Sequence, residues 1–84
     1  MTDSIKFRTL SGDAASIRPG RYRHFKGGEY EVIGVGKHTE TLEEFVVYRP
    51  VDVSDRVLSI RPLTMFREQV DRDGYRGPRF VPLD

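Results

Sequence analysis

GRYRHFKGGEYEVIGVGKHTETLEEFVVYRP, residues 20–50, is the stretch of sequence that best predicts the fold. Side chains alternate along Arg21–Phe25, and Glu29–Lys37 is rich in β-branched and aromatic residues, as expected of strands. The Gly27-Gly28 pair between them supplies the residues of a tight hairpin turn. These features predict an antiparallel hairpin, which a polar turn at His38–Leu42 connects to the next strand.

The remaining sequence predicts more short strands, at residues 43–49, 57–61, 67–70 and 80–81. Residues 62–66 have the length of a single helical turn, often 3₁₀, with Met65 and Phe66 facing inward. We therefore expect an all-β fold, an antiparallel barrel or roll of about five strands with one short helical turn.

Two glycines, Gly34 and Gly36, indicate a bend or bulge in the second strand. The alternation does not decide which face of that strand is buried, because Tyr30 and Val32 share their face with His38. We expect two surfaces, an apolar one carrying Phe25 or Val32 with Phe45 and Val47, and a polar one on which His24, Lys26 and His38 meet.

Length and composition indicate one small domain. A chain of 84 residues buries only roughly 60 to 65 per cent of its unfolded surface, which leaves no room for a second core. We expect residues 1–17 to be a flexible leader and residues 18–84 to form the single domain. The chain has no cysteine, which excludes disulfides and thiolate chemistry.

No apolar run approaches the roughly 20 residues that span a bilayer, and the N-terminus lacks the apolar core of a signal peptide. We therefore expect a cytoplasmic protein that does not bind a membrane. The net charge of +1 is too small to indicate a nucleic-acid ligand by itself. Basic residues gather at 18–26 and acidic ones at 40–44, so the surface is expected to be dipolar.

Residues 20–50, followed by IRPLTMF at 60–66, resemble a family of small bacterial domains that is named only as a domain of unknown function. The family pattern is G-x-Y-x-H-[FY]-K-G-x-x-Y-x-V, then H-[ST]-E-[ST], V-[VL]-Y-[RE] and V-R-P-x-x-M-F. The resemblance implies an SH3-like β-barrel and no established activity. The chain departs from the pattern at Ser59, where the family often carries tryptophan, and in the loop at 52–56.

His24, His38 and Glu40 are the nearest approach to a metal site, since imidazole and carboxylate groups are good metal ligands. Their spacing matches no metal motif, so we favour structural or hydrogen-bonding roles for them. One histidine oriented by Glu40 could act as a general base, but no serine or threonine nucleophile stands at a recognisable elbow. We therefore expect no cofactor, and no catalytic residue is assigned.

Cations and flat rings in the same part of the chain form the candidate ligand-binding set: Tyr22, His24, Lys26, His38, Glu40, Tyr48, Arg49 and Arg61. Cations meet phosphate and tyrosine rings stack on bases, the combination that small β-barrels use to bind single strands. The alternative, which we favour for each tyrosine, is an amphipathic ring at the edge of the core. For Arg61 we favour a structural ion pair with Glu40 or Glu44.

Three hypotheses of function follow from these residues. The first is a non-enzymatic binding module for a nucleotide, RNA or another anionic ligand. The second is a small metal-dependent or histidine-based hydrolase, and the third is an accessory domain that pairs with a protein partner through an edge strand. We favour the binding module over an enzyme.

Overall fold

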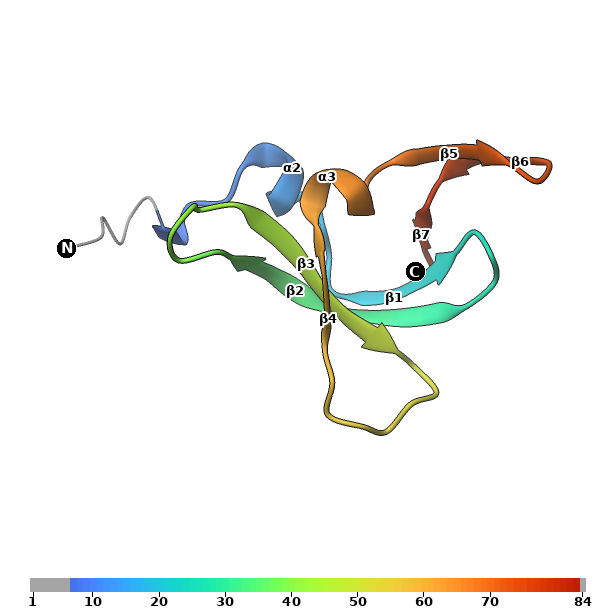
Figure 1. Ribbon diagram of the computed structural model, residues 1–84, viewed down its shortest axis with the longest axis horizontal. Helices are drawn as coiled ribbons and strands as arrows, with labels where there is room; N and C mark the ends of the chain where they lie inside the picture. Colours follow the sequence, from blue (N-terminus) through green and yellow to red (C-terminus); the bar gives the residue numbers. More distant parts are fainter. Residues whose placement is uncertain (1–6, 84) are drawn as a thin grey trace.

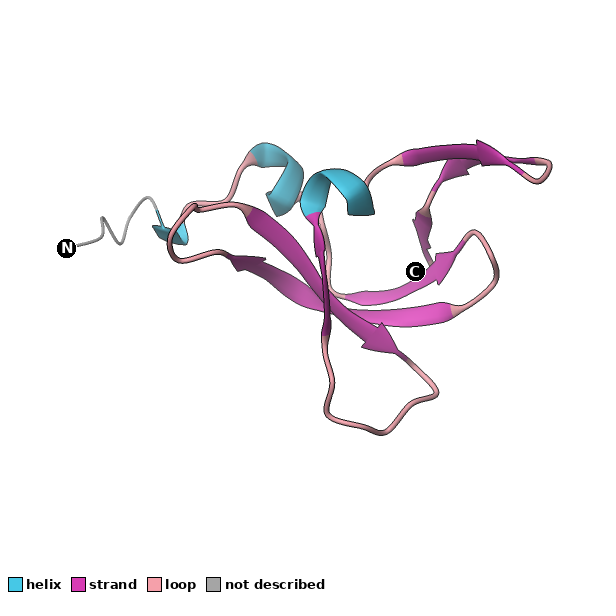
Figure 2. Cartoon of the chain, in the orientation of Figure 1, coloured by secondary structure: helices cyan, strands magenta, loops and turns pink. Residues whose placement is uncertain are grey.

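A five-stranded antiparallel sheet and a separate two-stranded hairpin make up the fold (Figures 1 and 2). The computed structural model describes residues 7–83. The larger sheet has the order β4-β3-β2-β1-β7, and β5 pairs with β6. The strands are β1 (Gly20–His24), β2 (Glu29–Lys37), β3 (Glu44–Pro50), β4 (Ser59–Pro62), β5 (Gln69–Arg72), β6 (Tyr75–Pro78) and β7 (Phe80–Pro82), and the short helices are α2 (Gly12–Ala15) and α3 (Leu63–Phe66).

The all-β prediction is confirmed, but the predicted barrel is wrong because the sheet does not close. Strands β4 and β7 form its two edges and do not pair with each other. The chain between them turns at Asp73 and Gly74, which have φ angles of 55° and 80°, and folds into the separate β5–β6 hairpin. The residues between β4 and β7 thus pair with each other in a hairpin and do not bridge the two edges of the larger sheet.

A bulge in β2 explains which side chains are buried. The register between β2 and β3 shifts between Val32 and Gly34, as the glycines had indicated. Val32 is 1% exposed and the bulged Ile33 is 47% exposed, whereas Val35 packs against the core again. The strand thus changes its alternation in the middle, which simple period-two reasoning does not allow for.

The inner face of β3 carries Val46 and Tyr48, both of which are buried. The expected apolar surface with Phe45 and Val47 is therefore wrong, since the inward face is the other one of the two. Val47 instead lies opposite Ile60 of β4 on the outer face, where Ile60 is exposed.

An aromatic cluster fills the inner face of the sheet. The rings of Phe66 and Phe80 stack with centroids 4.3 Å apart and planes at 6°. Tyr22 meets Phe66 edge to face, and Tyr48 meets both phenylalanines in the same way. Such offset and T-shaped pairs stabilise by roughly 0.5–1.5 kcal/mol each beyond the area they bury.

The short helix α3 brings Phe66 into this cluster. Its single turn buries Leu63 and Phe66, which are three residues apart and so share a face. Met65 is 45% exposed, so the expectation that it faces inward is wrong. Within the described part of the chain, neither helix has the length and apolar character needed to cross a membrane.

The described part of the segment that we expected to be a flexible leader packs against the sheet. Ser11 caps α2, since its hydroxyl accepts a hydrogen bond from the Ala14 amide at 3.1 Å. Both the amide and the hydroxyl of Ser11 donate to the Glu44 carboxylate, at 2.8 and 2.7 Å. Ala14 is 1% exposed and belongs to the core.

Replacement of the cap should show that this segment contributes to stability. We predict that Ser11→Ala lowers the free energy of unfolding by about 1 kcal/mol, because it removes the cap and the hydroxyl hydrogen bond to Glu44, while the backbone amide still donates to that carboxylate. Urea unfolding measures this value, with Ser54→Ala in the exposed β3–β4 loop as the matched control. Equal stabilities of the two variants would show that residues 11–15 add nothing to the fold.

Candidate functional site

Two hairpins meet at one end of the sheet, where β7 runs from the second back to the first (Figure 1). The amide of Phe25, just after β1, donates to the carbonyl of Arg79 at 3.0 Å. The rings of Phe25 and Tyr75 stack with centroids 5.6 Å apart and planes at 24°. A residue of the β1–β2 turn and one of β6 thereby form a continuous aromatic surface.

Two cations lie over this surface. The guanidinium carbon of Arg72 is 5.2 Å from the centroid of the Phe25 ring, and the Lys26 ammonium is 6.0 Å from it. Within residues 7–83, neither Lys26 nor Arg72 forms an ion pair. Both charges are exposed and available to an anion.

A shallow pocket with a volume of about 220 Å³ opens beside the aromatic pair. Its lining consists of Arg23, His24, Phe25, Gly27, Tyr75, Val81 and Leu83. The lining is mostly apolar, and Arg23 adds a cation at its border. The pocket is smaller than the roughly 300–1,000 Å³ usual for drug-sized ligands, so it suits a single flat ring rather than a whole large cofactor.

His24 occupies the end of β1 with its ring on the inner face of the sheet. The ring centroid is 5.0 Å from that of Phe80, and Nδ1 accepts a hydrogen bond from the Lys26 amide at 3.1 Å. Partial burial lowers the pKa of His24 below its ordinary value of 6.5, and the nearby positive charges lower it further. These charges belong, in decreasing order of effect, to Arg79, Arg61, Lys26 and Arg72.

The structure does not bring His24, His38 and Glu40 together. His24 ends β1 beside the first residues of β2, whereas His38 follows the last residue of β2, roughly 30 Å away for nine residues at the usual strand rise. The Nδ1 atom of His38 accepts hydrogen bonds from the amides of Glu40 and Thr41, at 3.0 and 3.1 Å. His38 therefore has the structural role of closing a turn, and the polar surface expected from His24, Lys26 and His38 does not form.

Both the metal-site and the hydrolase hypotheses require His24, His38 and Glu40 to lie close together, which they do not. No cluster of three or more potential metal-ligating side chains occurs among the residues that the structure describes. The Glu40 amide donates to His38 Nδ1, and its carboxylate accepts from the Thr39 hydroxyl, so the carboxylate does not orient the distant His24 imidazole.

The tyrosines of the candidate set are core residues. Tyr22 and Tyr48 are buried, and the Tyr22 hydroxyl donates to the carbonyl of Arg18 at 2.9 Å. The Nε atom of Arg61 donates to the Tyr48 hydroxyl at 3.0 Å. Neither ring is accessible for stacking on a ligand, which agrees with the alternative that we favoured for the tyrosines.

The two remaining arginines of the candidate set have different surroundings. The ion pair that we expected between Arg61 and Glu40 or Glu44 does not form. Arg61 lies opposite Val46 and donates to the Tyr48 hydroxyl, and the Glu44 carboxylate accepts from Ser11. Arg49 forms an ion pair with Glu31, 3.4 Å between nitrogen and oxygen, on the outer face. Only Lys26 and His24 of the candidate set thus reach the end of the sheet where the hairpins meet, and Arg61 lies near them.

The candidate set lacked most of the pocket lining, and above all the aromatic pair of Phe25 and Tyr75 and the cation Arg72 beside it. The Asp73-Gly74 pair is a typical turn sequence, but the strand after it was not predicted, because glycine and proline at Gly77 and Pro78 are unfavourable in strands. A hairpin around this turn would have placed Arg72 opposite Tyr75, which is the register observed. The contact of Tyr75 with Phe25 joins residues 50 positions apart and leaves no local signal.

Comparisons with known proteins agree with the fold. A family model described as "Protein of unknown function (DUF1653)" matches residues 20–82. A crystal structure of a protein of that family from Bordetella bronchiseptica is similar to this chain, with a TM-score of 0.74 and 35% sequence identity. The similarity covers 83% of this chain and 91% of the other one. A search among curated proteins finds no match.

The lowered pKa of His24 makes stability depend on pH. The unfolded chain takes up a proton on this histidine at a higher pH than the folded protein does. Stability should therefore decrease as the pH falls from about 7.5 through the ordinary pKa toward the lower folded one, and level off below it. We predict that His24→Gln removes this part of the pH dependence, measured by urea unfolding at a series of pH values.

His38→Gln is the control, because it removes the other histidine and leaves the surroundings of His24 intact. The comparison uses the change in the free energy of unfolding with pH in each protein. A loss of stability that is the same at every pH does not affect this comparison. Identical pH profiles for the wild type and His24→Gln would contradict the prediction.

Proposed function

The chain belongs to the DUF1653 family of proteins of unknown function, and within it we propose that this protein is a non-enzymatic binding module for nucleotides. The unit recognised is a flat base with its phosphate, either as a free nucleotide or within a single-stranded nucleic acid. The observation that carries this proposal is the pocket beside the stacked Phe25 and Tyr75 rings, with unpaired cations around it.

The apolar part of the pocket suits the base. Phe25 and Tyr75 offer aromatic surface, and Val81 and Leu83 add aliphatic contacts. Stacking of a base on an aromatic side chain contributes roughly 1–3 kcal/mol and depends little on the identity of the base. A volume of about 220 Å³ holds one such ring.

The cations suit the phosphate. Arg23 lines the pocket, and Lys26 and Arg72 lie over the Phe25 ring. Arg23 already pairs with Glu29 at 3.1 Å, so Lys26 and Arg72 supply the charges that no carboxylate of residues 7–83 neutralises. A phosphate bound there gains attraction without breaking an existing ion pair.

A titration followed by ¹H–¹⁵N spectra tests the proposal. Adenosine monophosphate and a short single-stranded oligonucleotide are added separately at low salt. We predict saturable shifts of the Phe25, Lys26, Arg72 and Tyr75 amides. Oligonucleotide affinity should fall with added salt, by about 0.7 in the logarithmic slope for each phosphate contacted.

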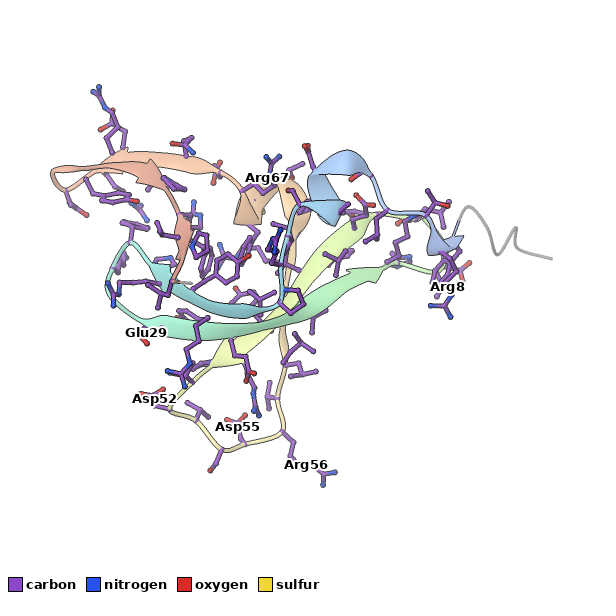
Figure 3. All side chains as sticks on the ribbon, turned by 180° about the vertical axis from the view of Figure 1, so that it is seen from behind. Arg8, Glu29, Asp52, Asp55, Arg56 and Arg67 are labelled. Carbon is purple, nitrogen blue, oxygen red and sulfur yellow. The ribbon has the colours of Figure 1, made fainter. Side chains whose placement is uncertain are left out.

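Matched variants locate the site. Arg72→Gln should reduce the salt slope, and Tyr75→Ala should weaken binding by roughly 5- to 100-fold through lost stacking. Arg56→Gln removes the same charge from the β3–β4 loop, which extends away from the β5–β6 hairpin (Figure 3), and should bind normally. Absence of saturable shifts with both ligands, or equal losses in Arg56→Gln and Arg72→Gln, would overturn the proposal.

A further inference from the structure

A second group of nitrogen atoms lies around Phe80 on the inner face of the sheet. The His24 ring, from β1, meets the Phe80 ring with centroids 5.0 Å apart and planes at 76°. The guanidinium carbon of Arg61, from β4, lies 5.8 Å from the centroid of the same ring. Strands at nearly opposite sides of the sheet thus bring an imidazole and a guanidinium to one aromatic side chain.

Both side chains retain unused hydrogen-bond donors. His24 uses Nδ1 to accept from the Lys26 amide, so its neutral tautomer carries the proton on Nε2. Arg61 uses Nε to donate to the Tyr48 hydroxyl. Among residues 7–83, no partner is found for His24 Nε2 or for the two terminal nitrogens of Arg61.

The surroundings are positively charged. Arg79, Arg61, Lys26 and Arg72 all act on His24, and no carboxylate is among the groups that do so. Arg79 is bound through Nη2 to Glu68 at 2.6 Å, and its side chain is 16% exposed. Arg79 Nε is buried and has no partner within the described residues. One carboxylate therefore pairs with a group of four cations, and this leaves an excess of positive charge beside the imidazole.

We infer that the inner face binds a small oxyanion, such as inorganic phosphate, between His24 and Arg61. The terminal nitrogens of Arg61 would donate to two of its oxygens, and His24 Nε2 to a third. Burial and the nearby cations both disfavour the protonated imidazole, and the bound negative charge favours it, so His24 takes up a proton when the anion binds. By linkage, the anion then binds more tightly as the pH falls.

This site goes beyond the proposed function, because it lies on the other face of β1. His24 lies opposite Phe80 on the inner face, whereas Arg23 lies opposite Val81 on the outer face that forms the nucleotide pocket. His24 borders both sites, but Arg61 and Phe80 do not line the pocket, and Tyr75 does. Residues of each site can therefore be changed separately.

Titration with inorganic phosphate tests the inference, with chloride added at matched ionic strength as the reference. The imidazole resonances of His24 are followed near pH 6, and their pH titration is recorded with and without phosphate. We expect saturable His24 shifts with phosphate alone and a raised pKa of His24 in its presence. Phosphate affinity should fall by roughly tenfold in Arg61→Gln and stay unchanged in Arg56→Gln.

Arg61→Gln leaves the buried Tyr48 hydroxyl with a weaker partner, so Arg61→Lys, which keeps the charge but loses the fork of donors, is measured beside it. Arg61→Lys should also weaken phosphate binding. Phosphate shifts no larger than those with chloride, or full affinity in both Arg61 variants, would overturn the inference. If adenosine monophosphate still moves Tyr75 in that case, the proposed function stands and only the inner anion site fails.

Discussion

The stack of Phe66 on Phe80 is the contact on which the rest of the structure depends. Its nearly parallel rings, 4.3 Å apart, join the helical turn after β4 to the last strand. Strand β7 has only three residues, and pairing with β1 alone would hold it weakly. Because Phe80 is anchored, β7 stays on the sheet, and the β5–β6 hairpin that precedes it is held above the β1–β2 turn. The Phe80 ring also contacts the His24 imidazole and the Arg61 guanidinium.

The open sheet accounts for where function is expected. A closed barrel would have used residues 67–79 to cover its edge, whereas here they form a hairpin whose Tyr75 reaches Phe25. Positive charges gather at this end. Partial burial lowers the pKa of His24 most, and these charges lower it further. Clusters of like charge and shifted pKa values are typical of functional sites, so the gathered cations support an anion-binding role. The match to the family model and to the crystal structure of a family member supports the fold, and neither match names a ligand.

Local features of the structure were predictable from the sequence, and long-range ones were not. Strand β2 was predicted with its bounds, since β-branched residues between a glycine turn and a polar turn give a clear signal. The buried face of β2 was not predicted, because a one-residue bulge at Ile33 reverses the alternation of inward and outward side chains. Lys26 and His24 were candidates from their residue types, and the structure places both at the end of the sheet where the hairpins meet. Phe25 and Tyr75 come together only in the tertiary fold. Whether Arg61 meets Tyr48 depends on which face of β4 points inward, and the sequence does not show this.

The central claim is that the end of the sheet where the two hairpins meet holds the ligand. A crystal structure of the protein grown with adenosine monophosphate at low salt tests it most directly. We expect the adenine ring against Phe25 and Tyr75, with the phosphate beside Lys26 or Arg72. Adenosine monophosphate bound elsewhere, for example at the exposed β3–β4 loop, with this pocket empty, would contradict it.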